Sequence, residues 1–332
     1  MKNVMLEKRK DGLDVIRILA TILVFTVHFF LRTNYYNVYL DSISLKLQSV
    51  IRNFCMSCVP LFIILTGFLN KKKKYDKKMF KGLLDILIIW FVYSTIEFII
   101  LNVINNGTLN FLTYLKELTS FKYAYSWYIK MYIGLYMMTP VINTAYENFD
   151  NKNRKILVFI SIILTFIPNF IKVISNGILL LPDYWIGFYI LTYYLIGKYI
   201  STNDINISKR NLLLLLVLNV FLIYSYQPFE NIDYNSFLIL TQTVLIFLLL
   251  YNINFKNKII KKISEYVSGL TLDMYLVSSL IDFLIYKFYF NKFSLTNISQ
   301  GRIILYAPII LLTSFFVSLV IASIRKLIIK VR

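Results

Sequence analysis

The chain has 332 residues, 58% of them hydrophobic, and its mean hydropathy is +0.64. A water-soluble protein of this length does not carry so large an apolar fraction, and long uncharged stretches recur from end to end, which is typical of polytopic membrane proteins. In a soluble protein the net charge of +19 would suggest nucleic-acid binding. Here Lys and Arg cluster between the apolar stretches, as in cytoplasmic loops, so no nucleic-acid partner is expected.

The sequence predicts an all-α, polytopic membrane protein with one membrane-embedded domain over residues 1–332. Ten apolar stretches are each long enough to cross a hydrocarbon core of ~30 Å as a helix. The basic residues gather at both ends and in every second loop, so the positive-inside rule places both termini in the cytoplasm. The ten predicted spans are 13–32, 47–69, 82–104, 124–145, 156–174, 180–199, 211–227, 236–254, 267–290 and 303–324.

The first stretch carries two ionisable residues, Arg17 and His28, and His28 is the only histidine in the chain. Eleven positions along a helix amount to about 20° past three full turns and roughly 16 Å of rise, so both side chains share one face. With the N-terminus inside, Arg17 lies near the cytoplasmic face and His28 lies beyond the midplane. Ionisable groups at such depths usually face a protein interior or a watery cavity and serve function.

His28 is the candidate catalytic base, because a neutral imidazole takes a proton from a hydroxyl near neutral pH, as acyl transfer to an alcohol requires. The alternative is a histidine that only joins helices by hydrogen bonds. Arg17 either contacts an anionic substrate or is an interfacial cation that extends to the membrane surface. Asp14 lies three residues before Arg17 on the same side and could pair with it.

Other charged and aromatic positions carry two interpretations each. The lysine run at 71–78 sets topology and attracts anionic lipid, or it collects the phosphates of a cytoplasmic donor such as coenzyme A. Trp127 and Tyr128 are interfacial belt residues or a stacking floor for a sugar. Lys130 lies within a predicted span, where a belt position does not explain it.

The remaining chemistry-bearing residues limit the function further. Asp85, Glu97 and Asp273 lie in predicted spans, and each could partner an internal cation. Cys55 and Cys58 lie in an apolar stretch far from the single histidine, so no zinc set can be assembled and no metal is expected. The chain has no P-loop and no G-x-S-x-G motif, so ATP-driven transport and serine-hydrolase chemistry have no support.

Several stretches resemble the acyltransferase 3 family of membrane acyltransferases, in the order in which the family has them. Arg17 and His28 match its R-x10-H signature. Residues 59–69 (VPLFIILTGFL) resemble the end of its second span, and Trp127-Tyr128 followed by residues 135–140 (LYMMTP) resemble its fourth. Residues 274–277 (MYLV) are similar to a late I-Y-L-x segment. The first three matches are fairly specific in combination.

The resemblance implies a ten-helix enzyme that takes an acyl group, commonly acetyl, from cytoplasmic acyl-CoA and transfers it to hydroxyls of envelope glycans. His28 would match the essential histidine of the family and Arg17 its partner. Lys78 and Lys81 stand where the family has R-x-x-R, which puts bidentate phosphate contacts in doubt. Ser278 replaces the histidine that often follows the late segment.

We therefore expect a multi-pass O-acyltransferase of the plasma membrane that moves acetyl from acetyl-CoA to a cell-envelope glycan or lipid-linked sugar. Membrane lipid and the acceptor are the expected partners, and a homo-oligomer is left open. The alternative is a non-enzymatic exporter or flippase of a glycan or lipid-linked sugar, with proton coupling at the histidine. The predicted site comprises catalytic His28 and Arg17, donor-binding Lys78, Lys81 and Arg17, acceptor-binding Trp127, Tyr128 and Lys130, and supporting Asp14.

Overall fold

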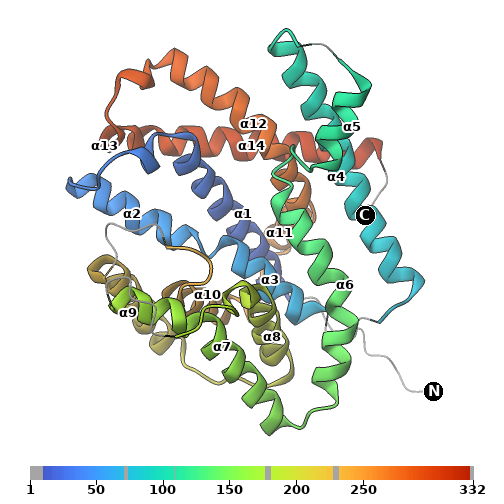
Figure 1. Ribbon diagram of the computed structural model, residues 1–332, viewed down its shortest axis with the longest axis vertical. Helices are drawn as coiled ribbons and strands as arrows, with labels where there is room; N and C mark the ends of the chain where they lie inside the picture. The colour runs from blue at the N-terminus through green and yellow to red at the C-terminus, as the bar shows by residue number, and fades with distance from the viewer. Residues whose placement is uncertain (1–9, 71–73, 108, 176–180, 227–231, 330–332) are drawn as a thin grey trace.

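A computed structural model describes residues 10–70, 74–107, 109–175, 181–226 and 232–329. All regular secondary structure in these ranges is helical, which confirms the predicted all-α class (Figure 1). The helices are α1 (Asp11–Arg32), α2 (Ile43–Cys55), α3 (Cys58–Leu69), α4 (Lys77–Ile104), α5 (Phe111–Thr119), α6 (Trp127–Glu147), α7 (Asn151–Ile174), α8 (Tyr189–Thr202), α9 (Lys209–Tyr226), α10 (Phe237–Leu250), α11 (Lys258–Ser268), α12 (Thr271–Lys292), α13 (Gln300–Ile303) and α14 (Ala307–Ile328). Short 3-10 helices lie in the connections: η1 (Tyr35–Asn37), η2 (Ile186–Phe188), η3 (Leu295–Asn297) and η4 (Ile304–Tyr306).

Five helical segments of the described chain are long and apolar enough to cross a membrane, and a bent pair brings the number to six. The five are Asp11–Arg32, Ile43–Leu69, Lys77–Ile104, Asn151–Lys172 and Gln300–Ile328, and the pair is α11 with α12, bent by 58°. Helices α6, α8, α9 and α10 lie at the other four predicted spans but are shorter or less apolar. The count of ten and the positions of the termini stay predictions.

The helices are arranged around α1 and α3. In Figure 1, α7 to α10 lie together on one side of α3, α4 to α6 lie on the opposite side, and α12 runs beside α14. The most extensive helix contacts join α3 with α8 and α12 with α14, and α1 packs against α3, α11 and α12. Helix α1 is thereby central, which positions its side chains for contacts with the distant α12.

Two glycines allow α3 and α8 to approach closely. A Cβ atom at Gly67 would lie 2.0 Å from the carbonyl oxygen of Tyr194, and one at Gly197 would lie 2.0 Å from that of Ile64. A carbon atom and a carbonyl oxygen that are not bonded cannot approach to 2.0 Å, so α3 needs glycine at position 67 and α8 needs glycine at position 197. Small residues at helix crossings are a common means of close packing in membranes.

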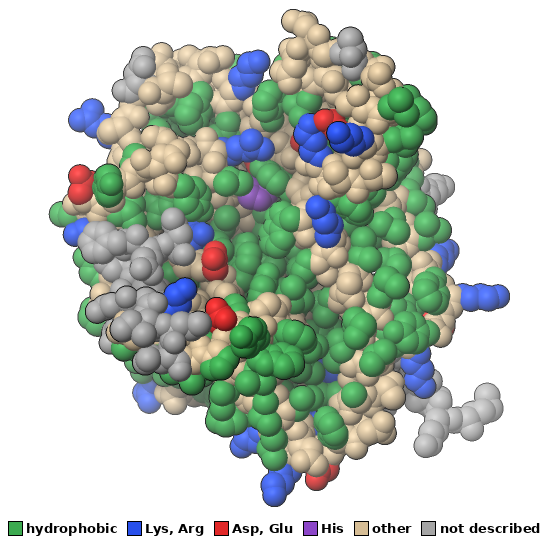
Figure 2. All heavy atoms as spheres, in the orientation of Figure 1, with side chains coloured by type: hydrophobic (Ala, Val, Ile, Leu, Met, Phe, Trp, Pro, Cys, Tyr) green, Lys and Arg blue, Asp and Glu red, His purple; other side chains and the backbone are tan. Residues whose placement is uncertain are grey.

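The outer surface is rich in apolar side chains. Exposed large hydrophobic residues lie along α4, α7, α9 and α14, and green side chains cover much of the face drawn in Figure 2. In water such continuous patches would drive association, whereas lipid is a suitable solvent for them. Together with the apolar spans, this surface supports a membrane protein.

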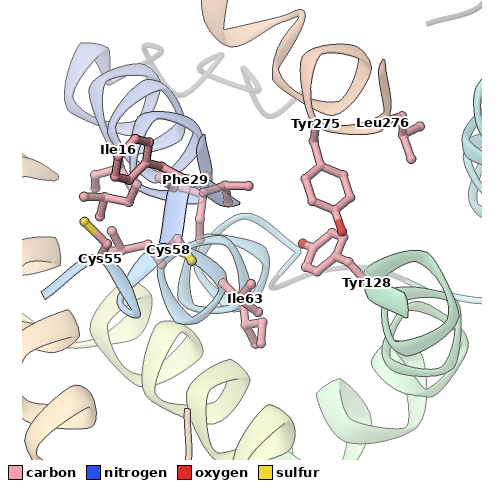
Figure 3. Packing of buried hydrophobic residues seen from close by; sticks show 14 of the residues in the cluster. Ile16, Phe29, Cys55, Cys58, Ile63, Tyr128, Tyr275 and Leu276 are labelled. Carbon is pink, nitrogen blue, oxygen red and sulfur yellow. The ribbon is translucent and has the colours of Figure 1, made fainter. Parts of the chain in front are cut away.

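The interior combines an apolar core with buried polar groups. Figure 3 shows part of the core, to which α1 contributes Ile16 and Phe29, and the second predicted span contributes Cys55, Cys58 and Ile63. Both cysteines are buried and form no disulfide. Of the acidic residues expected to partner a cation, Asp273 does so. Its two carboxylate oxygens accept hydrogen bonds from Nε and Nη2 of Arg325 at 2.6 and 2.5 Å.

Candidate active site

Helix α1 places His28 against α12. The side chain of His28 is buried, and its Nδ1 atom lies 3.1 Å from Oδ2 of Asp282 on α12. The hydroxyl of Tyr125, in the connection between α5 and α6, donates to the same Oδ2 atom at 3.0 Å. The rings of His28 and Tyr125 lie 4.0 Å apart between centroids. Three segments distant in sequence thus meet at one carboxylate.

The contact with Asp282 favours one tautomer of the neutral imidazole. A carboxylate oxygen accepts, so the neutral ring carries its proton on Nδ1 and donates it to Asp282. The other ring nitrogen, Nε2, then keeps a lone pair for an incoming proton. Asp282 is buried and would stabilise the imidazolium that forms when Nε2 takes a proton. This geometry suits a general base.

Arg32 lies above this pair, one turn further along α1. Its Nε and Nη2 atoms donate to the hydroxyl oxygen of Tyr125 at 3.2 and 3.1 Å. The only histidine, drawn in purple in Figure 2, is visible at the bottom of a hollow with basic side chains near it. The His28 pair is therefore buried but lies directly beneath one face of the molecule.

A cavity of ≈ 290 Å³ lies between α1, α3, α4, α6 and α12. Arg17 lines it, and the remaining lining is mainly apolar and aromatic, including Val24, Tyr128, Tyr132 and Tyr275. Arg17 Nη1 lies 3.0 Å from Oδ1 of Asp14, so the predicted ion pair is present. The Ser268 hydroxyl donates to the same Asp14 oxygen at 2.6 Å, which helps to fix the carboxylate and, through it, the guanidinium.

Two tyrosines line the cavity on the side of α6 and α12, and one of them also lies near His28. Tyr275 of α12 and Tyr128 of α6 both line the cavity, and their ring centroids lie 5.5 Å apart (Figure 3). The centroid of Tyr275 is also 6.4 Å from that of His28. Arg17 thus lines the cavity together with Tyr275, whereas His28 does not line it and lies next to the ring of Tyr275.

The other predicted site residues lie apart from this centre. Lys78 and Lys81 are exposed on the first turns of α4. Trp127 is partly exposed and stacks on Tyr234, with centroids 6.0 Å apart. Lys130 is exposed and donates to the carbonyl oxygen of Ser120 at 3.2 Å. Neither Trp127 nor Lys130 lines the cavity.

Sequence reasoning missed Asp282. An acidic residue within an apolar stretch is a signal that singles out functional positions, and Asp282 shares a predicted span with Asp273. Nothing in the sequence indicates that Asp282 rather than Asp273 reaches α1.

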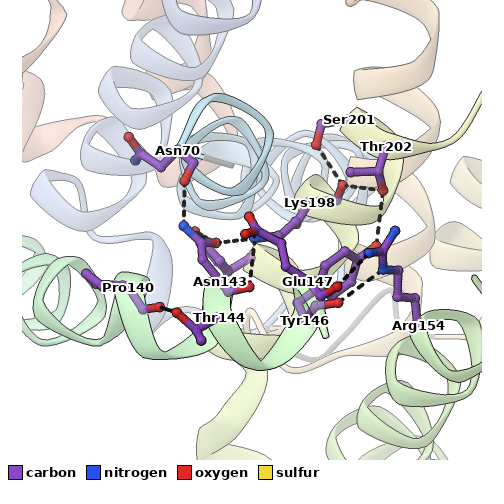
Figure 4. Close-up of polar contacts among 11 residues, drawn as sticks. Asn70, Pro140, Asn143, Thr144, Tyr146, Glu147, Arg154, Lys198, Ser201 and Thr202 are labelled. Atoms are coloured by element: carbon purple, nitrogen blue, oxygen red, sulfur yellow. Dashed lines mark hydrogen bonds and ion pairs between the residues drawn. The ribbon is translucent and has the colours of Figure 1, made fainter. Parts of the chain in front are cut away.

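A second buried polar cluster, also missed, joins α6 and α8 (Figure 4). The side chain of Lys198 is buried and its Nζ donates to Oδ1 of Asn143 at 2.5 Å, with Glu147 Oε1 at 3.4 Å. Asn143 in turn donates to the carbonyl oxygen of Asn70, which lines the cavity. A separate open hollow of ≈ 650 Å³ lies next to Asn143, lined by residues that include Lys74, Tyr75 and Thr144.

Comparison with known protein families shows the family to which the chain belongs. No curated protein and no solved structure matches it. A family model for the acyltransferase domain of the acyltransferase 3 family matches residues 10–324, nearly the whole chain. Members of this family transfer acyl groups other than amino-acyl groups. The chain therefore belongs to the acyltransferase 3 family, and it is an acyltransferase.

Proposed function

We propose that this protein is a multi-pass O-acyltransferase of the plasma membrane. It would move an acyl group, in the first instance acetyl, from cytoplasmic acyl-CoA to a hydroxyl of a cell-envelope glycan or lipid-linked sugar. The observation that carries the proposal is the tyrosine pair Tyr128 and Tyr275: both rings line the Arg17 cavity, and Tyr275 also lies next to the buried His28. Such an arrangement suits a reaction in which the donor occupies the cavity and the acceptor reaches His28.

The donor would enter the cavity with its acyl end towards the tyrosine pair. At ≈ 290 Å³ the cavity is at the lower end of the ~300–1,000 Å³ typical of small-molecule pockets, so it suits the pantetheine arm and not the whole donor. The nucleotide would stay outside, over the open hollow beside Lys74 and the exposed Lys78 and Lys81. Arg17, fixed by Asp14, would contact a polar part of the donor.

The acceptor would reach His28 from the hollow on the outer surface. Nε2 of His28 would take the proton of the acceptor hydroxyl while that oxygen attacks the thioester carbonyl. Asp282 would stabilise the resulting imidazolium, and the proton would return to the coenzyme A thiolate as it leaves. The product is an ester of the acceptor and free coenzyme A, so atoms and charges balance. The buried position of the pair limits hydrolysis of the thioester by water.

The test uses purified protein in liposomes with acetyl-CoA labelled on the acetyl group. We expect free coenzyme A to be released and the label to appear on an added glycan or lipid-linked sugar, and both should be lost in His28→Ala. The control is Lys256→Gln, an exposed position between α10 and α11 that does not line the cavity, which should keep donor turnover. An exporter would move unmodified glycan and consume no acetyl-CoA. Transfer retained in His28→Ala would refute the role of His28.

A further inference from the structure

The connection that presents Tyr125 to His28 has an unusual backbone. Between α5 and α6, the residues Phe121, Ala124 and Tyr125 have φ angles of 56°, 55° and 44°. L-amino acids other than glycine rarely adopt this left-handed region, and clusters of such residues persist only where surrounding contacts hold them. Two consecutive left-handed residues at Ala124 and Tyr125 therefore need anchors. Those anchors lie on α4 and α12.

Glu97 of α4 is the anchor at Ala124. Its side chain is buried, and Oε2 accepts a hydrogen bond from the backbone N–H of Ala124 at 2.7 Å. The other carboxylate oxygen, Oε1, accepts from the hydroxyl of Ser279 at 2.7 Å. Ser279 lies on α12 three residues before Asp282, so the two residues lie on one side of that helix. Glu97 thus connects the left-handed backbone at Ala124 with α12, the helix on which Asp282 lies.

Two further contacts hold the same connection. The hydroxyl of Tyr275 donates to the carbonyl oxygen of Tyr125 at 2.6 Å. The indole N–H of Trp90 donates to the hydroxyl of Ser126 at 2.6 Å. The backbone on both sides of the Tyr125 side chain is therefore fixed by buried groups of α4 and α12. As a result the ring of Tyr125 lies against His28 while its hydroxyl donates to Asp282.

We propose that Glu97 is a positioning residue for acyl transfer: it holds the Ala124–Tyr125 backbone so that Tyr125 covers His28 and completes the hydrogen bonds of Asp282. The inference deepens the proposed function and rests on His28 as the base. Glu97 does not line the cavity, and its carboxylate binds Ala124 and Ser279, so its effect on His28 is transmitted through these two residues. Without Glu97 the backbone relaxes, Tyr125 leaves the imidazole, and the base loses its fixed orientation.

The variants are Glu97→Ala, Glu97→Gln and the double variant Glu97→Ala with Ala124→Gly. Glutamine keeps one carbonyl oxygen as an acceptor, so Glu97→Gln should lower turnover less than Glu97→Ala does. Glycine adopts positive φ without a Cβ clash, so Ala124→Gly should restore part of the loss in Glu97→Ala. The control is Glu117→Gln. Glu117 lies on α5, and its carboxylate accepts hydrogen bonds from Lys122 and Tyr123 of the same connection, whereas the N–H of Ala124 donates to Glu97.

The first readout is steady-state turnover of acetyl-CoA. We expect Glu97→Ala to lower kcat by about 10²-fold, since small displacements of catalytic groups cost that much. The KM for the donor should stay unchanged, because Glu97, Ala124 and Tyr125 do not line the cavity. A merely structural role would change the amount of folded protein and not this division between kcat and KM.

The second readout does not depend on turnover. Diethyl pyrocarbonate acylates the unprotonated nitrogen of imidazole, and the single histidine gives one peptide to follow by mass spectrometry. His28 is 6% exposed and its ring packs against that of Tyr125, so labelling should be slow in the wild type. We expect it to become several-fold faster in Glu97→Ala, to return towards the wild-type rate in the double variant, and to be unaffected in Glu117→Gln.

The outcomes separate this inference from the proposed function. Faster labelling in Glu97→Ala with no acetyl-CoA turnover in the wild type would support the positioning role and refute the proposed reaction. Wild-type turnover with labelling unchanged in Glu97→Ala and Glu97→Gln would overturn the positioning role and leave the reaction intact. Should Glu97→Ala fail to fold, Glu97→Gln decides alone, with an intermediate change in both readouts supporting the inference and no change in either overturning it.

Discussion

Nδ1 of His28 and Oδ2 of Asp282 lie 3.1 Å apart, although 254 positions separate the two residues. The contact joins the first helix to the twelfth, and it favours one tautomer of the neutral imidazole. It also places a negative charge where the base would become positive. Because the two helices pack directly against each other, the pair needs no mobile segment to form.

Asp282→Asn should lower kcat strongly while the protein stays folded. An amide has nearly the shape of the carboxylate but neither fixes the Nδ1 proton nor stabilises an imidazolium. General bases typically contribute 10²–10⁴-fold, so we expect a loss of about 10²-fold or more. The measurement is coenzyme A release at saturating acetyl-CoA. A variant with wild-type kcat would show that Asp282 has no part in the reaction.

Val24→Phe should weaken donor use by filling the cavity. Val24 is buried on α1 and lines the space between Arg17 and the tyrosine pair, so a larger ring there occupies room that the donor arm needs. We expect kcat/KM for acetyl-CoA to fall about 10-fold, which corresponds to ~1.4 kcal/mol. The control is Ile22→Phe, since Ile22 is exposed on the same helix and does not line the cavity. Equal kinetics in the two variants would mean that the donor binds elsewhere.

The helical class and the facing of Arg17 and His28 could be predicted because both follow from short-range regularities. In lipid, the backbone N–H and C=O groups of a long apolar stretch must form hydrogen bonds within the segment, which favours a helix. Helical periodicity then sets which side chains share a face. The Asp14–Arg17 ion pair is also a short-range feature, since the two residues are three positions apart on one helix. For such features the sequence contains all of the required information.

The partners of these residues could not be predicted, because they depend on how distant helices pack. Asp273 and Asp282 look alike in sequence, yet Asp273 binds Arg325 and Asp282 binds His28. Lys130 is predicted to bind the acceptor from within a span, and in the structure it lies exposed on the first turn of α6. The buried role of Lys198 was missed because its partner Asn143 is 55 positions away.

Asp273→Ala should destabilise the protein without removing catalysis from the folded fraction. The bidentate partner Arg325 is 7% exposed, and the Tyr93 hydroxyl also donates to Asp273, at 3.1 Å. Loss of one member of a buried ion pair typically costs about 3–5 kcal/mol, because the other charge stays buried. Thermal unfolding in detergent should show a lower Tm, and Asp273→Ala combined with Arg325→Met should recover part of it. An unchanged Tm in Asp273→Ala would contradict the structural role.

Gly67→Ala and Gly197→Ala should both prevent normal packing of α3 against α8. In each case the added Cβ atom would lie 2.0 Å from a carbonyl oxygen of the opposite helix, and backbone cannot move aside as a flexible side chain can. Gly134→Ala is the matched control, because a Cβ atom there meets nothing within 4 Å on α6. Since alanine is favoured over glycine in helices by about 0.5–1 kcal/mol, Gly134→Ala should raise Tm slightly while the other two lower it or abolish folding. Equal Tm values in all three variants would show that α3 and α8 do not approach as closely as these two glycines allow.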